Sequence, residues 1–220
     1  MSKKTKTLFL SSAIAFILFV IFTLLLKYIN VKPAGPEDSL VGLDGLNEAL
    51  TFSSHPFFYD LTKYLGYFAL LLAVLYACTG FLQMIKRGGI AKVDKDLIAL
   101  GGVYALTIVV FVFFEFVVIN YRPVMMAEGL EASYPSTHTM LSIVVFLTSI
   151  HLARKQIKNK KLQNAAVIVC IALTVIAVAG RLISGVHWFT DIVGAVIISA
   201  SLVLLFYALI SLIKEKQNAD

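Results

Sequence analysis

The sequence predicts an all-α, polytopic membrane protein with six transmembrane helices. Hydrophobic residues make up 59% of the 220 residues, charged residues make up only 15%, and the mean hydropathy is +0.87. This composition is typical of an integral membrane protein, and a single membrane domain over residues 1–220 accounts for it. Apolar segments of the length that crosses a bilayer, about 17 to 25 residues, are predicted at six places. They cover residues 8–29, 61–85, 97–119, 136–153, 163–183 and 189–213.

The first of these segments has the charge layout of a signal peptide. Lys3, Lys4 and Lys6 precede the apolar run "LFLSSAIAFILFVIFTLLL". That run is longer than a cleaved signal sequence requires, and no clear A-x-A cleavage site follows it. We expect a retained signal anchor.

The basic residues are sorted by side when the chain is threaded through six spans. The segments "MSKKTK", "KRGGIAKVDK", "RKQIKNKK" and "KEK" hold 14 of the 19 basic residues, and all four fall on one side. Cytoplasmic loops carry an excess of Lys and Arg, so this side and both termini are predicted to be cytoplasmic in a cell membrane. The formal charge of +6 is therefore interpreted as a topology signal, and no nucleic-acid partner is expected.

Residues 30–60 are predicted to form a loop on the outer side of the membrane. It begins with the turn-forming "KPAGPEDS" and then places Leu40, Leu43, Leu46 and Leu50 at helical spacing. The pattern indicates a short amphipathic helix on the membrane surface, and a loop packed on the bundle would give the same pattern.

Five ionisable residues on three outer segments point to a functional site. Ionisable groups are costly near lipid, so a convergent set calls for a functional hypothesis. The five are Arg122, His138, Arg181, His187 and Asp191. A lone histidine at a membrane interface is more often a capping or interfacial residue, and His55 and His151 are interpreted in this way. Cys78 and Cys170 lie inside apolar runs, where neither a disulfide nor a zinc site is expected.

The residue types in this set suit a phosphate group. Two arginines offer planar, always-charged donors that match a phosphate dianion. Ser136 and Thr137 are predicted to start a helix with Pro135 in its first turn, so free backbone N–H groups would face the anion as well.

The histidines supply the complementary chemistry. His187 and Asp191 are four residues apart, which places them on one face of a helix and lets the carboxylate orient the imidazole. An oriented histidine is a credible nucleophile, and His138 is placed to protonate the leaving oxygen.

The same residues resemble the motifs of the type 2 phosphatidic acid phosphatase superfamily of membrane lipid phosphatases and related soluble acid phosphatases. Its three motifs are Lys-x6-Arg-Pro, Pro-Ser-Gly-His and Ser-Arg-x5-His-x3-Asp. The corresponding stretches here are "EFVVINYRP" at 115–123, "PSTH" at 135–138 and "GRLISGVHWFTD" at 180–191, so residues 115–191 form the candidate catalytic region.

The resemblance implies a phosphatase-type helical bundle and a role for each matching position. His187 would attack phosphorus to form a phosphohistidine, Asp191 would orient it, and His138 would act as the acid. The phosphoryl oxygens would be held by Arg122, Arg181 and the amides around Ser136 and Thr137. The family works without a metal ion, and neither a metal nor another cofactor is expected.

Three positions depart from the family pattern. Thr137 stands for its glycine, Gly180 for its serine, and Glu115 for its phosphate-binding lysine. Seven residues is close to two helical turns, so Glu115 is expected to share a face with Arg122 and to lie about 10 Å deeper in the bundle. Glu115 then either pairs with Arg122, meets a cationic or hydroxylated part of the substrate, or marks a weak or lost enzyme; Lys63 is a candidate for the missing charge.

The resemblance and the topology together predict a membrane lipid phosphatase acting at the outer leaflet. Its expected substrate is an isoprenoid pyrophosphate such as the undecaprenyl carrier, or a phospholipid phosphate such as phosphatidylglycerol phosphate or phosphatidic acid. The expected partners are this lipid and the bilayer, without an obligate protein partner. The alternatives are a lipid phosphotransferase and a non-hydrolysing lipid-phosphate binder or transporter on the same fold.

Overall fold

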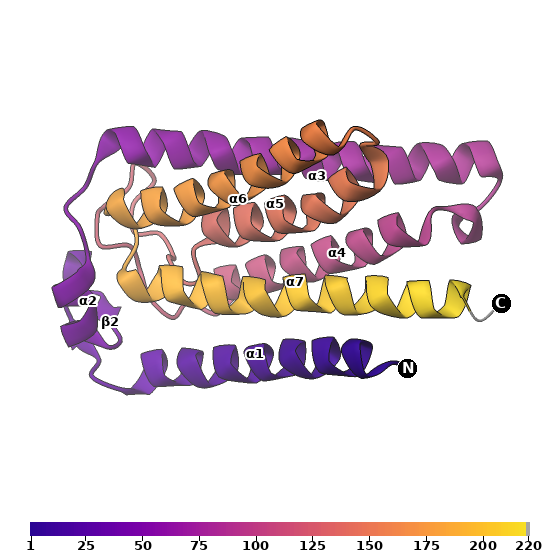
Figure 1. Cartoon of the computed structure of the whole chain (residues 1–220). Helices are drawn as coiled ribbons and strands as arrows, with labels where there is room; N and C mark the ends of the chain where they lie inside the picture. The colour runs from indigo at the N-terminus through magenta and orange to yellow at the C-terminus, as the bar shows by residue number, and fades with distance from the viewer. Residues whose placement is uncertain (219–220) are drawn as a thin grey trace.

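The computed structural model describes residues 1–218 as a bundle of long, side-by-side helices (Figure 1). The helices are α1 (Lys3–Tyr28), α2 (Asp44–Leu50), α3 (Pro56–Arg87), α4 (Lys95–Phe116), α5 (Thr137–Gln156), α6 (Lys160–Ile183) and α7 (Phe189–Gln217). Two short strands, β1 (Lys32–Pro33) and β2 (Leu40–Val41), pair antiparallel, and two 3-10 turns cover Pro36–Asp38 and Ile90–Lys92. The architecture is the all-α bundle that the sequence predicts.

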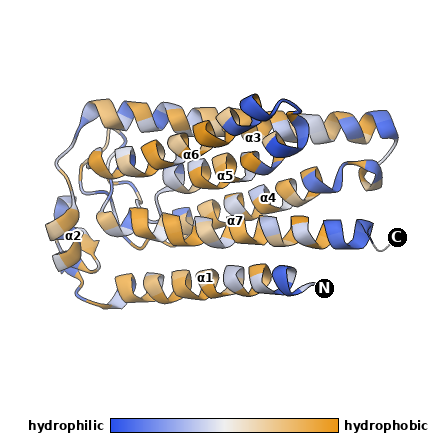
Figure 2. Ribbon diagram, in the orientation of Figure 1, coloured by the Kyte–Doolittle hydropathy of each residue, from blue (hydrophilic) through white to orange (hydrophobic). Residues whose placement is uncertain are grey.

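Each of the six predicted spans overlaps a long helix, and five of these helices are apolar enough to cross a membrane. Within the described residues these five are α1, α3, α4, α6 and α7. The remaining helix, α5, is enclosed by its neighbours, and most of its residues between 139 and 152 are buried. A helix that faces other helices tolerates the serines, threonines and histidines that a lipid-facing helix avoids. Figure 2 shows hydrophilic residues gathered at the helix ends next to the chain termini.

Helix α7 lies against α1, α4 and α5 and is the centre of the bundle. Its contact with α1 includes a reciprocal pair, because Ser12 Oγ donates to the Ser201 carbonyl at 2.8 Å and Ser201 Oγ donates to the Ser12 carbonyl at 2.9 Å. Small side chains at such positions let helix backbones approach closely. Thr5 and Ser2 bond to Glu215 at the end of the same interface.

The segment between α1 and α3 packs on the bundle through α2. Asn47 of α2 is fully buried, and its side chain donates to Thr190 Oγ1 at 3.1 Å and accepts from the Thr190 N–H at 3.1 Å. Leu46 and Leu50 of the same helix stay exposed. Asn47 of α2 therefore caps the first turn of α7, although it lies 143 residues earlier in the chain.

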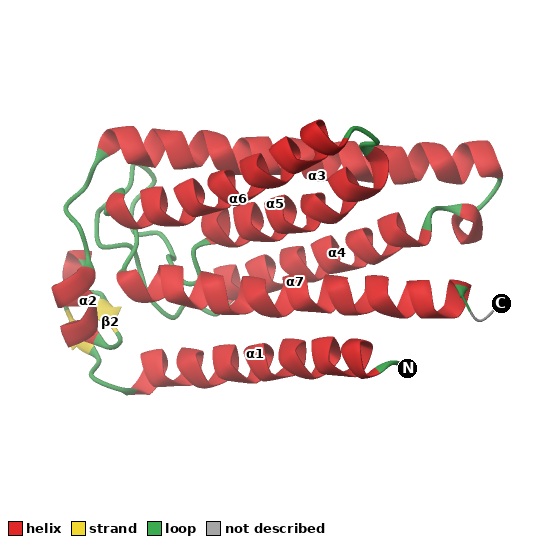
Figure 3. Ribbon diagram, viewed as in Figure 1, coloured by secondary structure: helices red, strands yellow, loops and turns green. Residues whose placement is uncertain are grey.

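The predicted end of the third span is wrong in one respect. Helix α4 ends at Phe116, and residues 117–136 form an irregular loop in which Tyr121 and Ala132 make an isolated antiparallel bridge. The apolar stretch "VVI" continues the hydropathy past the helix end, which is why the prediction extended to residue 119. Glu115 and Arg122 consequently do not share a helix face. Figure 3 shows that this loop and those before α3 and α7 gather at the end of the bundle opposite the termini.

Candidate active site

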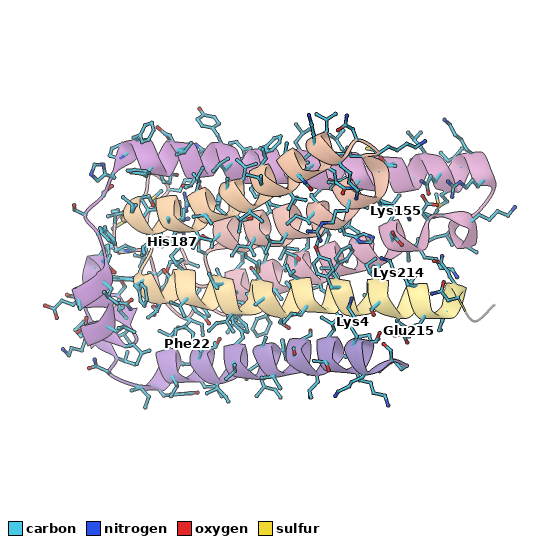
Figure 4. All side chains as sticks on the ribbon, in the orientation of Figure 1. Lys4, Phe22, Lys155, His187, Lys214 and Glu215 are labelled. Atoms are coloured by element: carbon cyan, nitrogen blue, oxygen red, sulfur yellow. The ribbon has the colours of Figure 1, made fainter. Side chains whose placement is uncertain are left out.

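A cavity of about 480 Å³ lies among these loops and is lined by part of the predicted site. It is lined by the last turns of α4, by the loop over residues 117–136 and by His187, which Figure 4 labels at this end of the bundle. Arg122, Thr137 and Glu115 line the same cavity. Three of the segments that the sequence singled out thus meet in one place.

His187 lies in the tight turn between α6 and α7. Gly185, two residues earlier, has a φ of +66°, a value that favours glycine. A Cβ atom on Gly185 would lie 2.5 Å from the Phe52 carbonyl oxygen, so the outer loop passes directly over this turn. The predicted helical pairing of His187 with Asp191 is wrong in detail, because His187 precedes Trp188, the N-cap residue of α7.

The two ring nitrogens of His187 nevertheless have separate partners. Nδ1 lies 3.4 Å from Asp191 Oδ2 without hydrogen-bond alignment, and Nε2 lies 3.3 Å from Arg122 Nη1. A guanidinium can only donate, so Nε2 is the unprotonated nitrogen and the ring proton sits on Nδ1, toward Asp191. This tautomer leaves the Nε2 lone pair available as a nucleophile.

The surroundings of His187 keep its imidazole neutral. Only 2% of the residue is exposed, and this burial lowers the pKa of His187 well below its usual range. The positive charges of Arg122 and Arg181 lower the pKa further, and His138 adds to the effect. A neutral ring is the form that can attack phosphorus.

Asp191 is held by backbone and side-chain donors at the start of α7. The residue is fully buried; its Oδ2 accepts from the Trp188 N–H at 3.0 Å and its Oδ1 accepts from Asn120 Nδ2 at 3.2 Å. These bonds fix the carboxylate in front of His187. Asn120 was missed by the sequence analysis, and its only signal was a polar residue inside the apolar stretch "VVIN".

Arg181 is a buried guanidinium without a carboxylate partner. It is 1% exposed, its Nη1 donates to Thr62 Oγ1 at 3.3 Å, and its Cζ lies 5.2 Å from the centre of the Tyr59 ring. Among residues 1–218 no carboxylate oxygen lies within 4 Å of it. Burying an uncompensated charge is costly, so the arrangement suits an anion that binds from outside the chain.

Arg122 is paired with a residue that the sequence analysis did not consider. Its Nε lies 2.9 Å from Glu131 Oε2 as an ion pair, and its backbone N–H donates to the Glu131 carbonyl at 3.0 Å. The Arg122 Nε–H is not aligned for a hydrogen bond with Glu131, so the contact between the two side chains is electrostatic. The predicted pairing of Arg122 with Glu115 is therefore replaced by one with Glu131.

Ser136 and Thr137 begin α5, and the structure gives them different roles. Ser136 is the N-cap residue, is fully buried, and uses its N–H to bond the Asp191 carbonyl at 3.2 Å. Pro135 precedes it and so lies outside the first turn where it was predicted. Thr137, the first helical residue, lines the cavity. The helix start therefore offers the amides from Thr137 onward, while that of Ser136 supports the Asp191 segment.

His138 lies in an adjoining apolar cavity of about 360 Å³ between α3, α4 and α5. Thr137 and Phe111 line both cavities, so the two are neighbours. The Nδ1 atom of His138 is buried without a hydrogen-bond partner in the described part of the chain. A Cβ atom on Gly66 of α3 would lie 2.4 Å from its Cδ2, so Gly66 makes the room for the imidazole.

The other candidates lie outside this centre. Lys63 lies on α3 with its Nζ 6.0 Å from the Tyr59 and Tyr67 rings and does not line the larger cavity. His55 is the exposed N-cap residue of α3. His151 pairs with Asp96 at the opposite end of the bundle. In residues 1–218 both cysteines are free, and no group of three or more His, Cys, Asp and Glu side chains is placed to hold a metal ion.

Comparison with known proteins agrees with this geometry. The chain is similar over 93% of its length, with a TM-score of 0.61 and 18% sequence identity, to 96% of a transmembrane PAP2-type phosphatidylglycerolphosphate phosphatase from Bacillus subtilis. No curated protein matches the sequence. The model of the PAP2 superfamily matches residues 96–214, more than half of the chain and the whole of the candidate catalytic region. The chain therefore belongs to the PAP2 superfamily, the type 2 phosphatidic acid phosphatases.

Proposed function

We propose that this protein is a membrane lipid phosphatase that works through a phosphohistidine on His187. The observation that carries the proposal is the buried, neutral His187, fixed between Asp191 and Arg122 with the unpaired Arg181 nearby. This arrangement combines an unprotonated ring nitrogen, which Arg122 contacts, with the positive charge of Arg181, which has no carboxylate within 4 Å among residues 1–218.

The proposed reaction gives each group one role. Nε2 of His187 attacks phosphorus, the bond from phosphorus to the leaving oxygen breaks, and its electron pair goes to that oxygen. His138 gives a proton to the leaving oxygen. Water then attacks phosphorus, the bond from phosphorus to His187 Nε2 breaks, and the water proton passes to His138. Phosphate is released and both histidines return to their starting states. Arg122 and Arg181 stabilise the charge on the phosphoryl oxygens throughout.

The adjoining cavity supports a lipid substrate. Its lining is almost entirely apolar, with Leu70, Ile108 and Met140 among its residues, and it lies beside His138. A hydrocarbon chain would gain from burial there while its phosphate reaches the charged cavity. Expected substrates are an isoprenoid pyrophosphate or a phospholipid phosphate. The PAP2-type relative from Bacillus subtilis is described as a phosphatidylglycerolphosphate phosphatase, which adds that lipid to the set worth assaying.

The site is proposed to face the outer leaflet. Both termini lie at the end of the bundle opposite His187, together with Lys4, Lys155 and Lys214 (Figure 4). By the positive-inside rule the basic end is cytoplasmic. In a Cys78→Ser, Cys170→Ser background, Met125→Cys should react with an impermeant maleimide from outside intact cells, and Lys158→Cys should not. The reverse labelling pattern would contradict the orientation.

Hydrolysis is tested with purified protein in lipid nanodiscs. Undecaprenyl pyrophosphate, phosphatidylglycerol phosphate and phosphatidic acid are offered with a chelator present, and released phosphate is measured. We expect release by the wild type and by His55→Ala, and none by His187→Ala. An acid-labile phosphoryl group should be trapped on the wild type and on His55→Ala, and not on His187→Ala.

The alternatives have distinct outcomes in the same assay. A phosphotransferase would move the group to an added lipid alcohol faster than to water. A binder would retain the lipids on both proteins without releasing phosphate, and that result would overturn the proposal.

A further inference from the structure

The larger cavity has an acidic mouth above a floor that contains Arg122 and His187. Glu115, Glu128 and Glu131 line it, and Arg122 is the single basic residue among its lining. Glu115 and Glu128 are exposed, whereas Arg122 is 9% and His187 2% exposed. The carboxylates therefore lie toward solvent, and the nucleophile lies at the bottom.

This charge distribution is unfavourable for a phosphate that arrives without a counter-charge. Three carboxylates and one guanidinium line the cavity, and that guanidinium already pairs with Glu131 at 2.9 Å. Like charges in a partly buried site repel more strongly than in water. A substrate that contributes a positive charge of its own would remove this conflict.

The carboxylates also come from two different segments. Glu115 belongs to the last turn of α4, and Glu128 and Glu131 belong to the loop that follows it. In the described part of the chain they do not join into a group that could hold a metal ion. They are separate acceptors around one opening, a layout that suits a hydrogen-bond donor with several N–H groups.

We infer that the cavity selects a lipid phosphate whose phosphate-bearing end also carries a protonated amine. This inference rests on the proposed phosphatase function and specifies its substrate class. The ammonium group would meet Glu115 and Glu131 at the mouth while the phosphate reaches His187 at the floor. When the ammonium pairs with Glu131, the guanidinium of Arg122 is released to the phosphate, so the correct substrate assembles its own binding site.

The test uses three matched probes that differ at one carbon. Dodecyl phosphate is compared with its 2-hydroxy and 2-amino derivatives in detergent micelles, and kcat/KM is measured for each. A charge-assisted hydrogen bond is stronger than a neutral one, so we expect the amine to exceed the unsubstituted probe by about tenfold, with the hydroxyl between them.

Variants of the mouth assign the effect to its carboxylates. Glu115→Gln and Glu131→Gln should each reduce the preference for the amine, and Glu131→Gln should raise turnover of the unsubstituted probe because Arg122 is then free. Glu48→Gln is the matched control, since Glu48 lies on α2 at the same end of the bundle but does not line the cavity. It should keep the wild-type ratio.

Failure of the inference is distinguishable from failure of the proposed function. Release of phosphate from all three probes without preference for the amine would overturn the inference and leave the phosphatase intact. Absence of phosphate release from every probe would overturn the proposed phosphatase function. In that case the preference for the amine is measured by calorimetry, as the ratio of the dissociation constants of the three probes for the His187→Ala protein. Equal dissociation constants would overturn the inference as well.

Discussion

The two ends of the bundle each contain a buried histidine–aspartate pair, and the pairs differ in what surrounds them. At the end with the termini, His151 Nε2 lies 2.8 Å from Asp96 Oδ2, and Lys155 Nζ donates to the same oxygen at 2.8 Å. Asp96 is in the first turn of α4, and its partners are on α5, so the pair ties two helices together. The negative charge of Asp96 is balanced by the positive charge of Lys155 within this group of three residues.

At the opposite end the His187–Asp191 pair is longer, at 3.4 Å, and its charges are not balanced internally. Arg122 contacts the histidine, and Arg181 has no carboxylate within 4 Å among the described residues. Residue types alone therefore do not distinguish the pair that ties two helices together from the pair proposed to act on phosphate. The guanidinium of Arg181 does distinguish them, because a buried positive charge without a carboxylate suits a bound anion.

The largest expected contrast comes from neutralising each aspartate. Asp191→Asn removes the acceptor for the Nδ1 proton of His187, and we expect phosphate release to fall on the order of 10⁴-fold, as for other oriented histidines. Asp96→Asn should leave kcat/KM within a few-fold of the wild type and lower the Tm. Equal losses of activity in the two variants would contradict the comparison.

The second expected effect concerns the proposed acid. His138→Ala should reduce release of a lipid alcohol by about 10²- to 10⁴-fold, the usual range for general acid catalysis. With p-nitrophenyl phosphate, whose leaving group needs no proton, the loss should be much smaller. His151→Ala is the control and should affect both substrates equally and weakly. An equal loss of both substrates in His138→Ala would assign His138 to binding instead.

A smaller effect is expected from the helix contact that positions this acid. Gly66→Ala places a methyl group where Cδ2 of His138 now lies, 2.4 Å from the new Cβ, and should displace the imidazole. We expect activity to fall by about tenfold, since a small misplacement of a catalytic group is costly. Gly80→Ala on the same helix meets only Val93 at 4.0 Å and should change neither activity nor Tm.

The smallest expected effect is a shift in pH dependence. The pKa of His187 is lowered by burial and by the two arginines, so the neutral nucleophile persists below pH 6.5, where a free imidazole is already protonated. The acid limb of kcat/KM should therefore lie below that value, and Arg122→Gln should move it to higher pH. Because the unfolded chain takes up this proton first, stability should also fall as the pH drops below about 6.5. If Arg122→Gln does not shift the acid limb of kcat/KM, a group other than His187 controls that limb.

The helices were predictable because long apolar runs have few alternatives in a membrane. The convergence of Arg122, Arg181, His187 and Asp191 was also predictable, because the order of the spans brings their segments to one end. The enclosure of α5 was not, because hydropathy does not tell whether a helix faces lipid or protein.

The details of the site depended on tertiary contacts that leave no pattern in the chain. The bond from Asn120 to Asp191 joins positions 71 residues apart, and the ion pair of Arg122 with Glu131 depends on a loop where a helix end was expected. The proposed roles of Glu115 and His138 are tested by the substitutions described above.

The cap formed by α2 makes the catalytic geometry a property of the whole polypeptide. The PAP2 match begins at residue 96, yet Asn47 bonds Thr190, and the Gly42 N–H donates at 3.2 Å to Asn120 Oδ1, whose amide nitrogen in turn holds Asp191. Grafting residues 96–214 into another bundle would therefore transfer the reactive side chains without the scaffold that aligns them. An engineer who wishes to adjust this enzyme without touching its reactive residues would start at residues 42–47.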